Sequence, residues 1–487
     1  MPQYRNWPVR LALLAAAVSA AGAAMAVLGD SPTHSSQSSI STNSTANPQL
    51  IKRGAYLARA ADCMACHTRE GASQEYAGGR PIESPFGTIY ATNITPAPKA
   101  GIGEYREQDF AAALRQGIRA DGSYLYPAMP YPSYASLSDD DIKALYAYFM
   151  EGVAPVTEPA LKTSLSFPFN QRWAIRFWNW LFVDEVSNTS FANLSSDLSG
   201  DRQQLLERGR YLVQGAGHCG SCHTPRGLFM QEKALNDQDG DEYLAGTELN
   251  EWQVPSLRGG DASGLRDWSE DDVVDYLATG RNRHAATGGE MTSVIQHSTS
   301  HLTDADLSSI AAYLTTLGAT DKQRASSAPA STPSSHTAPD ATTRQLTSAT
   351  SLDEGARLYL DNCNACHFAN GRGADSVFPP LSGNTQVNAD NPTALISTIL
   401  YGAQLPSTPK RPERLQMPGF DWRLSNEEAA SLASFVRQSW SNDASRVTPE
   451  QVAEVRQAHG PGKPAQQGRP DSLDHAREDA ASTPPSN

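Results

Sequence analysis

The sequence lacks the features of several common protein classes. Its 487 residues carry a formal net charge of -14, so the basic surplus that a nucleic-acid-binding protein needs is missing. It has no Gly-rich phosphate loop of the GxxxxGK[ST] type and no GxGxxG motif after a strand-like run, which argues against nucleotide chemistry. The mean hydropathy of -0.47 excludes a polytopic membrane protein. The 39% of hydrophobic residues is too high for a wholly disordered chain.

Cysteine is also scarce, and all six cysteines occur in three copies of one pattern. CxxCH is the attachment signature of c-type haem: the two thiols add to haem vinyl groups, and the adjacent histidine reaches the iron as proximal ligand. A single copy would leave a thioredoxin-like redox pair or half a zinc site as alternatives. Three copies with no cysteine left over favour three covalently bound haem c groups and leave no thiol for structural disulfides. The copies are Cys63-Met-Ala-Cys66-His67, Cys219-Gly-Ser-Cys222-His223 and Cys363-Asn-Ala-Cys366-His367.

The first 28 residues predict export. Arginines precede an apolar run from Leu11 to Leu28, and Ala24-Met25-Ala26 offers a cleavage site, as in a secretory signal. An uncleaved N-terminal anchor is the alternative, because the run is almost long enough to span a bilayer. In both cases the body of the chain is exported, to the compartment where haem c is attached.

Around each motif the chain repeats the order helix, motif, helix. A short helix-like segment with a glycine and an aromatic residue precedes each motif, at residues 53–57, 208–212 and 354–359. The glycine is expected to let two helices approach closely; a helix-start residue without packing meaning is the alternative. Each repeat ends in a second amphipathic helix that opens with a capping box. The boxes are Ser138-x-x-Asp141, Thr303-x-x-Asp306 and Ser425-x-x-Glu428.

Two helices packed together around a haem is the cytochrome c arrangement. The sequence therefore predicts an all-α fold of three tandem cytochrome c-like domains, each wrapped around one haem. The expected segments are a signal or anchor at 1–28, a flexible leader at 29–48, the first domain at 49–155, an aromatic linker at 156–199, the second domain at 200–320, a disordered linker at 321–349, the third domain at 350–441 and a disordered polar tail at 442–487.

The sixth iron ligand is predicted in the loop before each last helix. In the first domain, no histidine lies between His67 and His218, and Met129 stands 9 residues before the capping box in a stiff, proline-flanked loop. Met150 is the alternative there, but it ends an amphipathic helix, where a core role is expected. In the third domain, Met417 stands 8 residues before its box and is the only methionine after Met291.

The second domain offers several candidate ligands. Met291 stands 12 residues before its capping box, whereas Met230 is 73 residues away, so Met291 is the predicted ligand. The histidines are then expected to be surface residues or hydrogen-bond donors near the site: His218, His284, His297 and His301. His/Met ligation raises the haem potential relative to more electron-donating ligand sets. It also closes the iron to substrate, which favours electron transfer over catalysis.

A proximal histidine usually donates its second ring N–H to a carbonyl, which fixes the orientation of the ring. In the third domain, Pro380 of Phe378-Pro379-Pro380-Leu381 is the expected acceptor. A plain loop proline is the alternative.

The motifs resemble the cytochrome c subunit of bacterial membrane-bound dehydrogenases. That family serves quinoprotein alcohol dehydrogenases and flavin-dependent gluconate and sorbitol-type dehydrogenases. The resemblance covers about residues 50–440, while the long linker and the polar tail depart from the family pattern. It rests on Ala77-Gly-Gly-Arg80-Pro81, Pro85-Phe-Gly-Thr-Ile-Tyr90, Asn93-Ile-Thr-Pro96, Tyr126-Pro-Ala-Met129-Pro-Tyr131, Cys219-Gly-Ser-Cys222-His223-Thr-Pro-Arg226 and Phe378-Pro-Pro-Leu381-Ser-Gly-Asn384.

The resemblance implies that the protein takes electrons from a dehydrogenase catalytic subunit, which holds PQQ or FAD, and passes them through three haems to ubiquinone or another respiratory acceptor. It also implies a location at the periplasmic face of the inner membrane and no substrate-oxidising activity of its own. One alternative is a self-contained multihaem peroxidase or reductase, against which the loop methionines argue. Another is a free periplasmic shuttle.

Residues 167–183, here called the aromatic segment, contain seven Phe or Trp residues. Trp173, Phe177, Trp180 and Leu181 share one helical face, and two arginines interrupt the segment. Amphipathic aromatic residues suit the membrane–water boundary, so this segment is expected to bind the membrane surface or the partner subunit. The alternative is a packed linker buried against its own domains.

Overall fold

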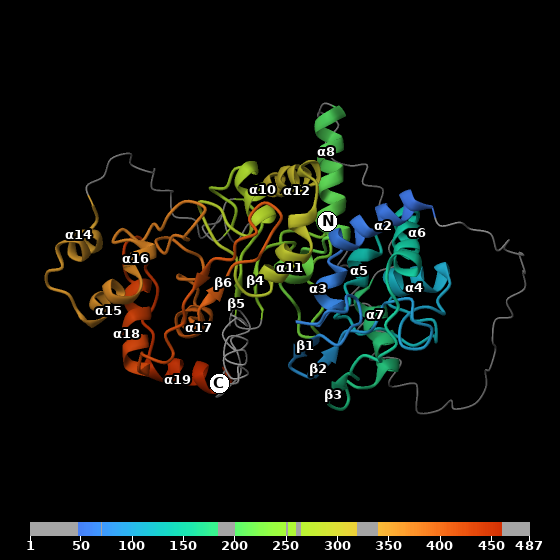
Figure 1. Ribbon diagram of the computed structural model, residues 1–487, viewed down its shortest axis with the longest axis horizontal. Coiled ribbons are helices and arrows are strands. Elements are labelled where there is room, and N and C mark those ends of the chain that lie inside the picture. Colours follow the sequence, from blue (N-terminus) through green and yellow to red (C-terminus); the bar gives the residue numbers. More distant parts are fainter. Residues whose placement is uncertain are drawn as a thin grey trace, which may run out of the picture. The chain divides into compact units, whose positions relative to one another are not determined.

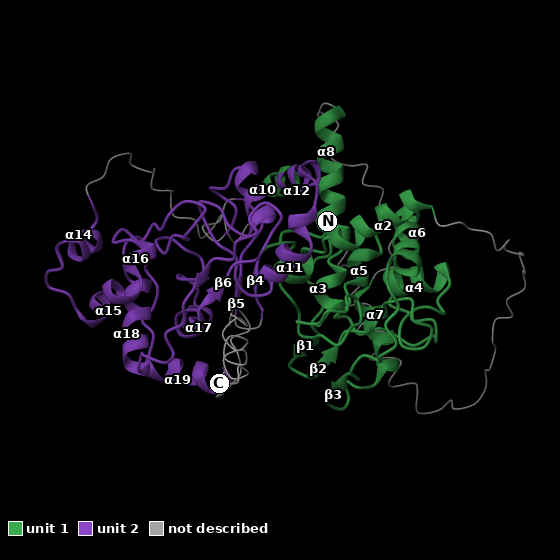
Figure 2. Cartoon of the chain, in the orientation of Figure 1, with its two compact units in different colours: residues 1–245, 312–320 green, residues 246–311, 321–487 purple. Residues whose placement is uncertain are grey.

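The computed structural model describes residues 47–69, 71–183, 200–249, 252–259, 264–318 and 339–459. The predicted signal and nearly all of the predicted leader therefore lie outside the described residues. The chain separates into two compact units, which Figure 2 colours separately in the orientation of Figure 1. Unit 1 comprises residues 1–245 and 312–320, and unit 2 comprises residues 246–311 and 321–487.

Unit 1 holds the first two CxxCH motifs and the aromatic segment. Its helices are α2 (Pro48–Ala60), α3 (Cys63–His67), α4 (Glu107–Gln116), α5 (Tyr131–Tyr134), α6 (Asp139–Ala147), α7 (Ile175–Phe182), α8 (Gly200–Tyr211) and α9 (Gly220–His223). Short turns of other helix types adjoin them: η2 (Tyr148–Gly152), η3 (Arg172–Ala174) and η4 (Leu212–Ala216). An antiparallel sheet has the order β1 (Pro81–Ser84), β2 (Gly87–Tyr90), β3 (Ser164–Leu165).

Unit 2 holds the third motif. Its helices are α10 (Glu270–Thr279), α11 (Met291–His297), η5 (Thr299–His301), α12 (Asp304–Thr316) up to Ala311, α14 (Ala341–Ser348), α15 (Glu354–Asn362), α16 (Asn364–His367), α17 (Thr393–Tyr401), α18 (Asn426–Arg437) and α19 (Pro449–His459). Two antiparallel pairs join β4 (Thr247–Leu249) to β5 (Trp252–Val254) and β6 (Ala403–Gln404) to β7 (Gln416–Met417).

The helix-rich part of the all-α prediction is confirmed, and the short strands are an addition to it. They form where loops fold back on themselves, and glycine makes this possible. At Gly87 the backbone has φ +122, and a Cβ there would collide with the carbonyl oxygen of Ser164 in β3. Because such pairs are only two to four residues long, they leave too little alternation for sequence analysis to detect.

Glycine also sets the contact between the first and last helices of a repeat. A Cβ at Gly54 of α2 would lie 2.6 Å from the Cβ of Tyr148 and closer still to the carbonyl oxygen of Ala144 in α6. A Cβ at Gly355 of α15 would lie 2.6 Å from both the Cβ of Phe435 and the carbonyl oxygen of Ser431 in α18. The close-approach hypothesis is therefore confirmed for the first and third repeats.

The capping boxes form to different extents. Ser425 and Glu428 exchange both bonds of the box at the start of α18. Ser138 accepts from the backbone N–H of Asp141 at 3.2 Å, but the Asp141 carboxylate does not return the bond to Ser138. It pairs with Arg53 of α2 at 2.6 Å and accepts from the hydroxyl of Tyr211. Because Tyr211 belongs to α8, buried Asp141 ties the first repeat to the start of the second.

The core of the third repeat extends beyond its predicted limits. Leu346 of α14 and Val452 and Val455 of α19 are buried in one cluster with residues of α15, α17 and α18. The disordered linker at 321–349 is therefore wrong for residues 341–348, and the disordered tail at 442–487 is wrong for residues 449–459. These segments are mostly polar, but their few apolar residues fall on one helical face, which is enough to dock a short helix.

The division between the two units passes through the second predicted domain, since residues 200–245 belong to unit 1 and residues 246–311 to unit 2. The boundaries of three separate domains stay a prediction.

We predict that Gly54→Ala and Gly355→Ala each destabilise the protein. Within a helix, Ala is normally more stable than Gly by about 0.5–1 kcal/mol. Here the added methyl group would overlap the neighbouring helix, and overpacking of this kind costs about 1–3 kcal/mol, so the steric effect decides the sign. The midpoint of thermal unfolding, followed by circular dichroism, should fall for both variants.

Gly200→Ala is the matched control for these variants. Gly200 begins α8, and nothing lies within 4 Å of a Cβ built there. This variant should leave the unfolding midpoint unchanged or slightly raised. A midpoint for Gly54→Ala at or above that of the wild type would contradict the close helix contact.

Candidate haem-binding sites

The first motif lies on the short helix α3, directly after α2. A left-handed residue, Asp62 with φ 51, turns the chain between the two helices. His67 points its Nδ1 at the carbonyl oxygen of Thr92, 2.6 Å away. A carbonyl can only accept, so Nδ1 carries the proton and Nε2 is left with its lone pair for a metal. Burial lowers the pKa of His67, which favours the neutral imidazole that ligates iron.

The third motif repeats this arrangement in unit 2. His367 is buried, its pKa is lowered by burial, and its Nδ1 donates to the carbonyl oxygen of Pro379 at 3.0 Å. The expectation that Pro380 supplies this carbonyl is wrong. The carbonyl of Pro380 accepts instead from the side-chain amide of Asn384 at 3.1 Å. Neighbouring carbonyls in an extended stretch point in opposite directions, so only one of them can face the histidine.

The cysteines are all unpaired by disulfides. Burial raises the pKa of the first thiol of each motif, Cys63, Cys219 and Cys363, to about 12. Redox-active CxxC pairs need the opposite shift, because a lowered pKa produces the reactive thiolate. The thioredoxin-like alternative is therefore disfavoured.

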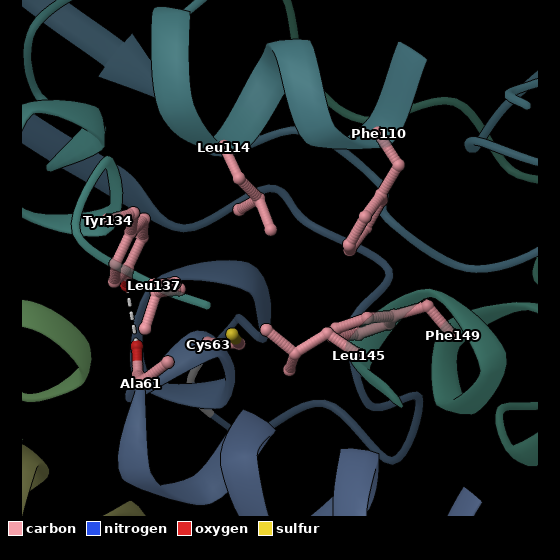
Figure 3. A pocket seen from close by; sticks show the side chains of 8 residues that line it. All are labelled: Ala61, Cys63, Phe110, Leu114, Tyr134, Leu137, Leu145 and Phe149. Carbon is pink, nitrogen blue, oxygen red and sulfur yellow. Dashed lines mark hydrogen bonds between the residues drawn. The ribbon is translucent and has the colours of Figure 1, made fainter. Parts of the chain in front are cut away.

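An apolar cavity adjoins Cys63 (Figure 3). It encloses about 220 Å³, in part open to solvent, and is lined by Ala61, Cys63, Phe110, Leu114, Tyr134, Leu137, Leu145 and Phe149. The one hydroxyl among them, that of Tyr134, donates to the carbonyl oxygen of Ala61 at 2.6 Å, so the cavity presents only the ring. In Figure 3, Phe110 and Leu114 of α4 point toward Cys63 from above, and Leu145 and Phe149 lie to its right. Apolar walls beside an attachment thiol fit a porphyrin.

Met129 lies in a tight loop between α4 and α5. Its N–H donates to the carbonyl oxygen of Tyr126 at 3.0 Å, and its own carbonyl accepts from the N–H of Tyr131 at 2.9 Å. The backbone on both sides of the sulfur-bearing residue is therefore fixed.

Met417 lies on β7, where it pairs with Ala403. Gly402, with φ +78, lets the carbonyl of Met417 come against its Cα, and the N–H of Phe420 donates to the carbonyl oxygen of Ile399 at 3.1 Å. The methionine loop of the third repeat is thus held to the end of α17.

In the second repeat, the motif residues Cys222 and His223 lie on α9, directly after Cys219. Met291 is the first residue of α11. Met230 lies in the loop after α9 at φ 62, and its carbonyl accepts from Arg226 at 2.6 Å. The choice of Met291 over Met230, like the pairing of each methionine with its histidine, stays a prediction.

The structure gives contacts for three other histidines of the second repeat, and their expected roles as surface residues or donors near the haem stay a prediction. His218 meets the edge of the Tyr134 ring with centroids 5.5 Å apart, and burial lowers its pKa to about 4. His284 stacks on Trp268 and lies 3.3 Å from Asp272. His301 lies 3.0 Å from the carbonyl oxygen of Gln296.

Two arginines support the motifs in a way that sequence analysis missed. Arg80 donates to the carbonyl oxygen of Ala65 at 2.6 Å, and Arg226 donates to that of Ser221. Ala65 and Ser221 hold the same position, directly before the second cysteine. Both arginines stand in segments that carried the family resemblance, but their acceptors inside the motif leave no trace in the spacing.

A buried carboxylate at the second motif was also missed. Glu232 accepts from the hydroxyl of Ser221 at 3.1 Å, and burial raises its pKa. A Cβ at Gly220 would lie 2.9 Å from its other oxygen, so the glycine inside this CxxC makes room for the carboxyl group.

A helix that begins with CxxC and ends in an oriented, neutral histidine beside an apolar cavity defines a covalent haem c site for electron transfer. The model of the cytochrome c family matches residues 51–152, 206–318 and 352–440, and each of the three segments contains one CxxCH motif. The chain belongs to the cytochrome c family.

Among curated proteins, the chain is similar to cytochrome subunits of dehydrogenases. It is 42% identical over 415 residues to the gluconate 2-dehydrogenase cytochrome c subunit of Pantoea cypripedii, covering 84% of this chain and 90% of the relative. It is 43% identical over 420 residues to the cytochrome c subunit of a quinone alcohol dehydrogenase of Gluconobacter oxydans, covering 85% and 84%. The fructose dehydrogenase cytochrome subunit of Gluconobacter japonicus is 40% identical over 425 residues, covering 85% and 84%. The predicted resemblance is confirmed, and the function is electron transfer by covalently bound haem c.

Proposed function

We propose that the chain is the triheme subunit of a membrane-bound dehydrogenase: it receives electrons from a catalytic subunit and passes them through three haems to ubiquinone or another respiratory acceptor. The observation that carries the proposal is the three matched segments, each with its own CxxCH motif. The relatives support it, because each is named as the cytochrome subunit of a dehydrogenase and aligns over more than four fifths of its length. PQQ or FAD would belong to the catalytic partner.

Each iron would be closed by His/Met ligation. The proposed pairs are His67 with Met129, His223 with Met291, and His367 with Met417. When bound, haem c supplies a one-electron Fe(III)/Fe(II) couple. The chain holds the proximal imidazoles in one tautomer through the carbonyls of Thr92 and Pro379, and it fixes the backbones of Met129 and Met417. Ligands held in this way would change little in position between the two oxidation states of the iron.

The aromatic segment would dock the protein on the periplasmic membrane surface. No helix in the described ranges is long and apolar enough to cross a bilayer. Trp173, Phe177 and Trp180 are nevertheless 66%, 53% and 44% exposed along η3 and α7. Large aromatic residues exposed together suit the interface between water and lipid. Export through residues 1–28 would bring the chain to that side of the inner membrane.

We predict that the mature protein carries three haems and that these are reduced by substrate only when the catalytic partner is present. Intact mass should exceed that of the polypeptide by three haem groups. A dehydrogenase should co-purify from washed membranes. Its substrate should convert the haem absorption spectrum from the oxidised to the reduced form only when that subunit is present. Two or fewer haems in mature protein would refute the count, and substrate oxidation by the isolated cytochrome would favour the self-contained enzyme.

Replacing the axial methionines is predicted to open the irons one at a time. Met129→Leu, Met291→Leu and Met417→Leu each remove the sulfur while keeping a side chain of similar size. In each variant one haem should become high-spin or bind carbon monoxide readily. Met230→Leu is the control and should leave all three haems unchanged; if it opens a haem while Met291→Leu does not, the assignment in the second repeat is reversed.

The docking role predicts a loss of membrane attachment in the triple variant Trp173→Ser, Phe177→Ser, Trp180→Ser. Burying one large aromatic side chain contributes about 1.5–3 kcal/mol, so removing three should release most of the protein from washed membranes. Haem content should stay intact, because no proposed ligand lies in the segment. Unchanged attachment together with unchanged quinone reduction would rule out this surface.

A further inference from the structure

The aromatic segment presents two different faces. The exposed residues lie on one of them. On the other, Ile175 is buried, the indole N–H of Trp178 donates to the carbonyl oxygen of Phe229 at 2.9 Å, and the ring of Phe182 lies 5.8 Å from that of Phe229. The segment is thus firmly seated within unit 1 by its inner face, and this face also contacts the loop that carries Met129.

Arg172 holds the start of that loop. Its guanidinium carbon lies 4.3 Å from the centroid of the Tyr126 ring, a cation–π contact. Its Nη1 donates to the carbonyl oxygen of Tyr124 at 2.7 Å. The Arg172 side chain therefore binds both the backbone of Tyr124 and the ring of Tyr126, which lie shortly before Met129.

Asn179 holds the other end of the loop. Its side-chain oxygen accepts from the hydroxyl of Tyr131 at 2.5 Å. Tyr131 is fully buried, so this hydrogen bond satisfies a polar group that burial would otherwise leave without a partner. Arg172 and Asn179 stand about two helical turns apart on the same segment, and they contact the loop on opposite sides of Met129.

Tyr126 and Tyr131, which Arg172 and Asn179 contact, are also the residues that hydrogen-bond to the backbone of Met129. The carbonyl oxygen of Tyr126 accepts from the N–H of Met129, and the N–H of Tyr131 donates to the carbonyl oxygen of Met129. A shift of either tyrosine therefore moves the methionine. Packing does not replace these contacts everywhere. A hollow of about 330 Å³, in part open to solvent, is bordered by Pro127 and Pro130 of the loop and by Trp178 and Phe182 of α7. On that side the loop is not closely packed against α7, so the contacts of Arg172 and Asn179 contribute to holding it in place.

We propose that Arg172 and Asn179 are positioning residues for the axial ligand of the first haem. They hold the Tyr126–Tyr131 loop in the conformation that keeps the sulfur of Met129 on the iron. The inference rests on the proposed ligation of that haem by Met129. It gives the inner face of the aromatic segment a function that is separate from docking by the outer face.

The test measures carbon monoxide binding by the reduced, full-length triheme protein, since carbon monoxide enters only when the methionine has left the iron. Arg172→Gln removes the cation, and Asn179→Leu removes the acceptor while keeping the size. In each variant one haem should bind carbon monoxide roughly tenfold faster than in the wild type, which corresponds to about 1.4 kcal/mol. The midpoint potential of one haem should also fall, because weaker Met ligation lowers it.

Arg176→Gln is the matched control. Arg176 lies in the same aromatic segment, on α7, and is exposed to solvent; its replacement removes the same charge. It should behave as the wild type in both measurements, and haem content should be equal in all variants. If Arg172→Gln and Asn179→Leu also behave as the wild type, the inference is wrong.

A double variant separates positioning from general damage. Met129→Leu alone should open one haem, and adding Arg172→Gln should then change nothing further, because the ligand it positions is gone. An additive increase would mean that Arg172 acts on another haem or on overall stability, which overturns the inference. If Met129→Leu leaves every haem closed, the ligand assignment itself fails and the inference falls with it. If it opens one haem while Arg172→Gln does not, only the inference fails.

Discussion

The close contact between the first and last helices of a repeat determines which side chains can surround the CxxCH helix. At Gly54 the backbone of α6 occupies the place of a side chain, and at Gly355 the backbone of α18 does the same. This contact draws the CxxCH helix, which follows the first helix directly, against the side chains of the last. Leu145 and Phe149 thereby reach the cavity at Cys63. A wider contact would leave those walls too distant to enclose an apolar group.

The proposed iron ligands are held by means that do not involve the helix contact. Carbonyls on distant loops orient two of the motif histidines, Thr92 for His67 and Pro379 for His367. Main-chain bonds fix the methionine loops. Arg80 and Arg226 each donate to a carbonyl inside a motif, which places a positive charge at the attachment edge of the first two sites.

Sequence analysis predicts most of what depends on local pattern. The CxxCH spacing, the glycines at the helix contact and the capping residue of each last helix are all local features. The structure agrees with the glycines of the first and third repeats and with all three capping residues. Sequence analysis fails where a residue has a choice of distant partners. Asp141 was expected to complete a capping box, but its carboxylate instead pairs with Arg53 and accepts from the hydroxyl of Tyr211. Pro379 and Pro380 cannot be told apart without the direction of each carbonyl.

The polar tail illustrates a second limit. Val452 and Val455 are too few to raise the apolar content of their segment, yet two residues one turn apart suffice when a core is already present to receive them. The contact between Arg172 and the Met129 loop illustrates a third limit. Arg172 appeared in the sequence as an interruption of an apolar face, whereas in the structure it is the residue that binds the loop. The chemistry of a side chain in such a position depends on which way its segment turns, and periodicity does not give that direction.

The place of Cys63 in the cavity wall has a consequence for how the protein is made. Its side chain lines one cavity with Phe110 and Leu114 of α4 and with Leu145 and Phe149, and α2 and α6 approach each other closely at Gly54 (Figure 3). Residues from both ends of the repeat therefore line this cavity, Ala61 and Cys63 from its start and Leu145 and Phe149 from its end. We expect the thioether bonds at this site to form before the last helix docks, because that helix completes the wall around the thiol.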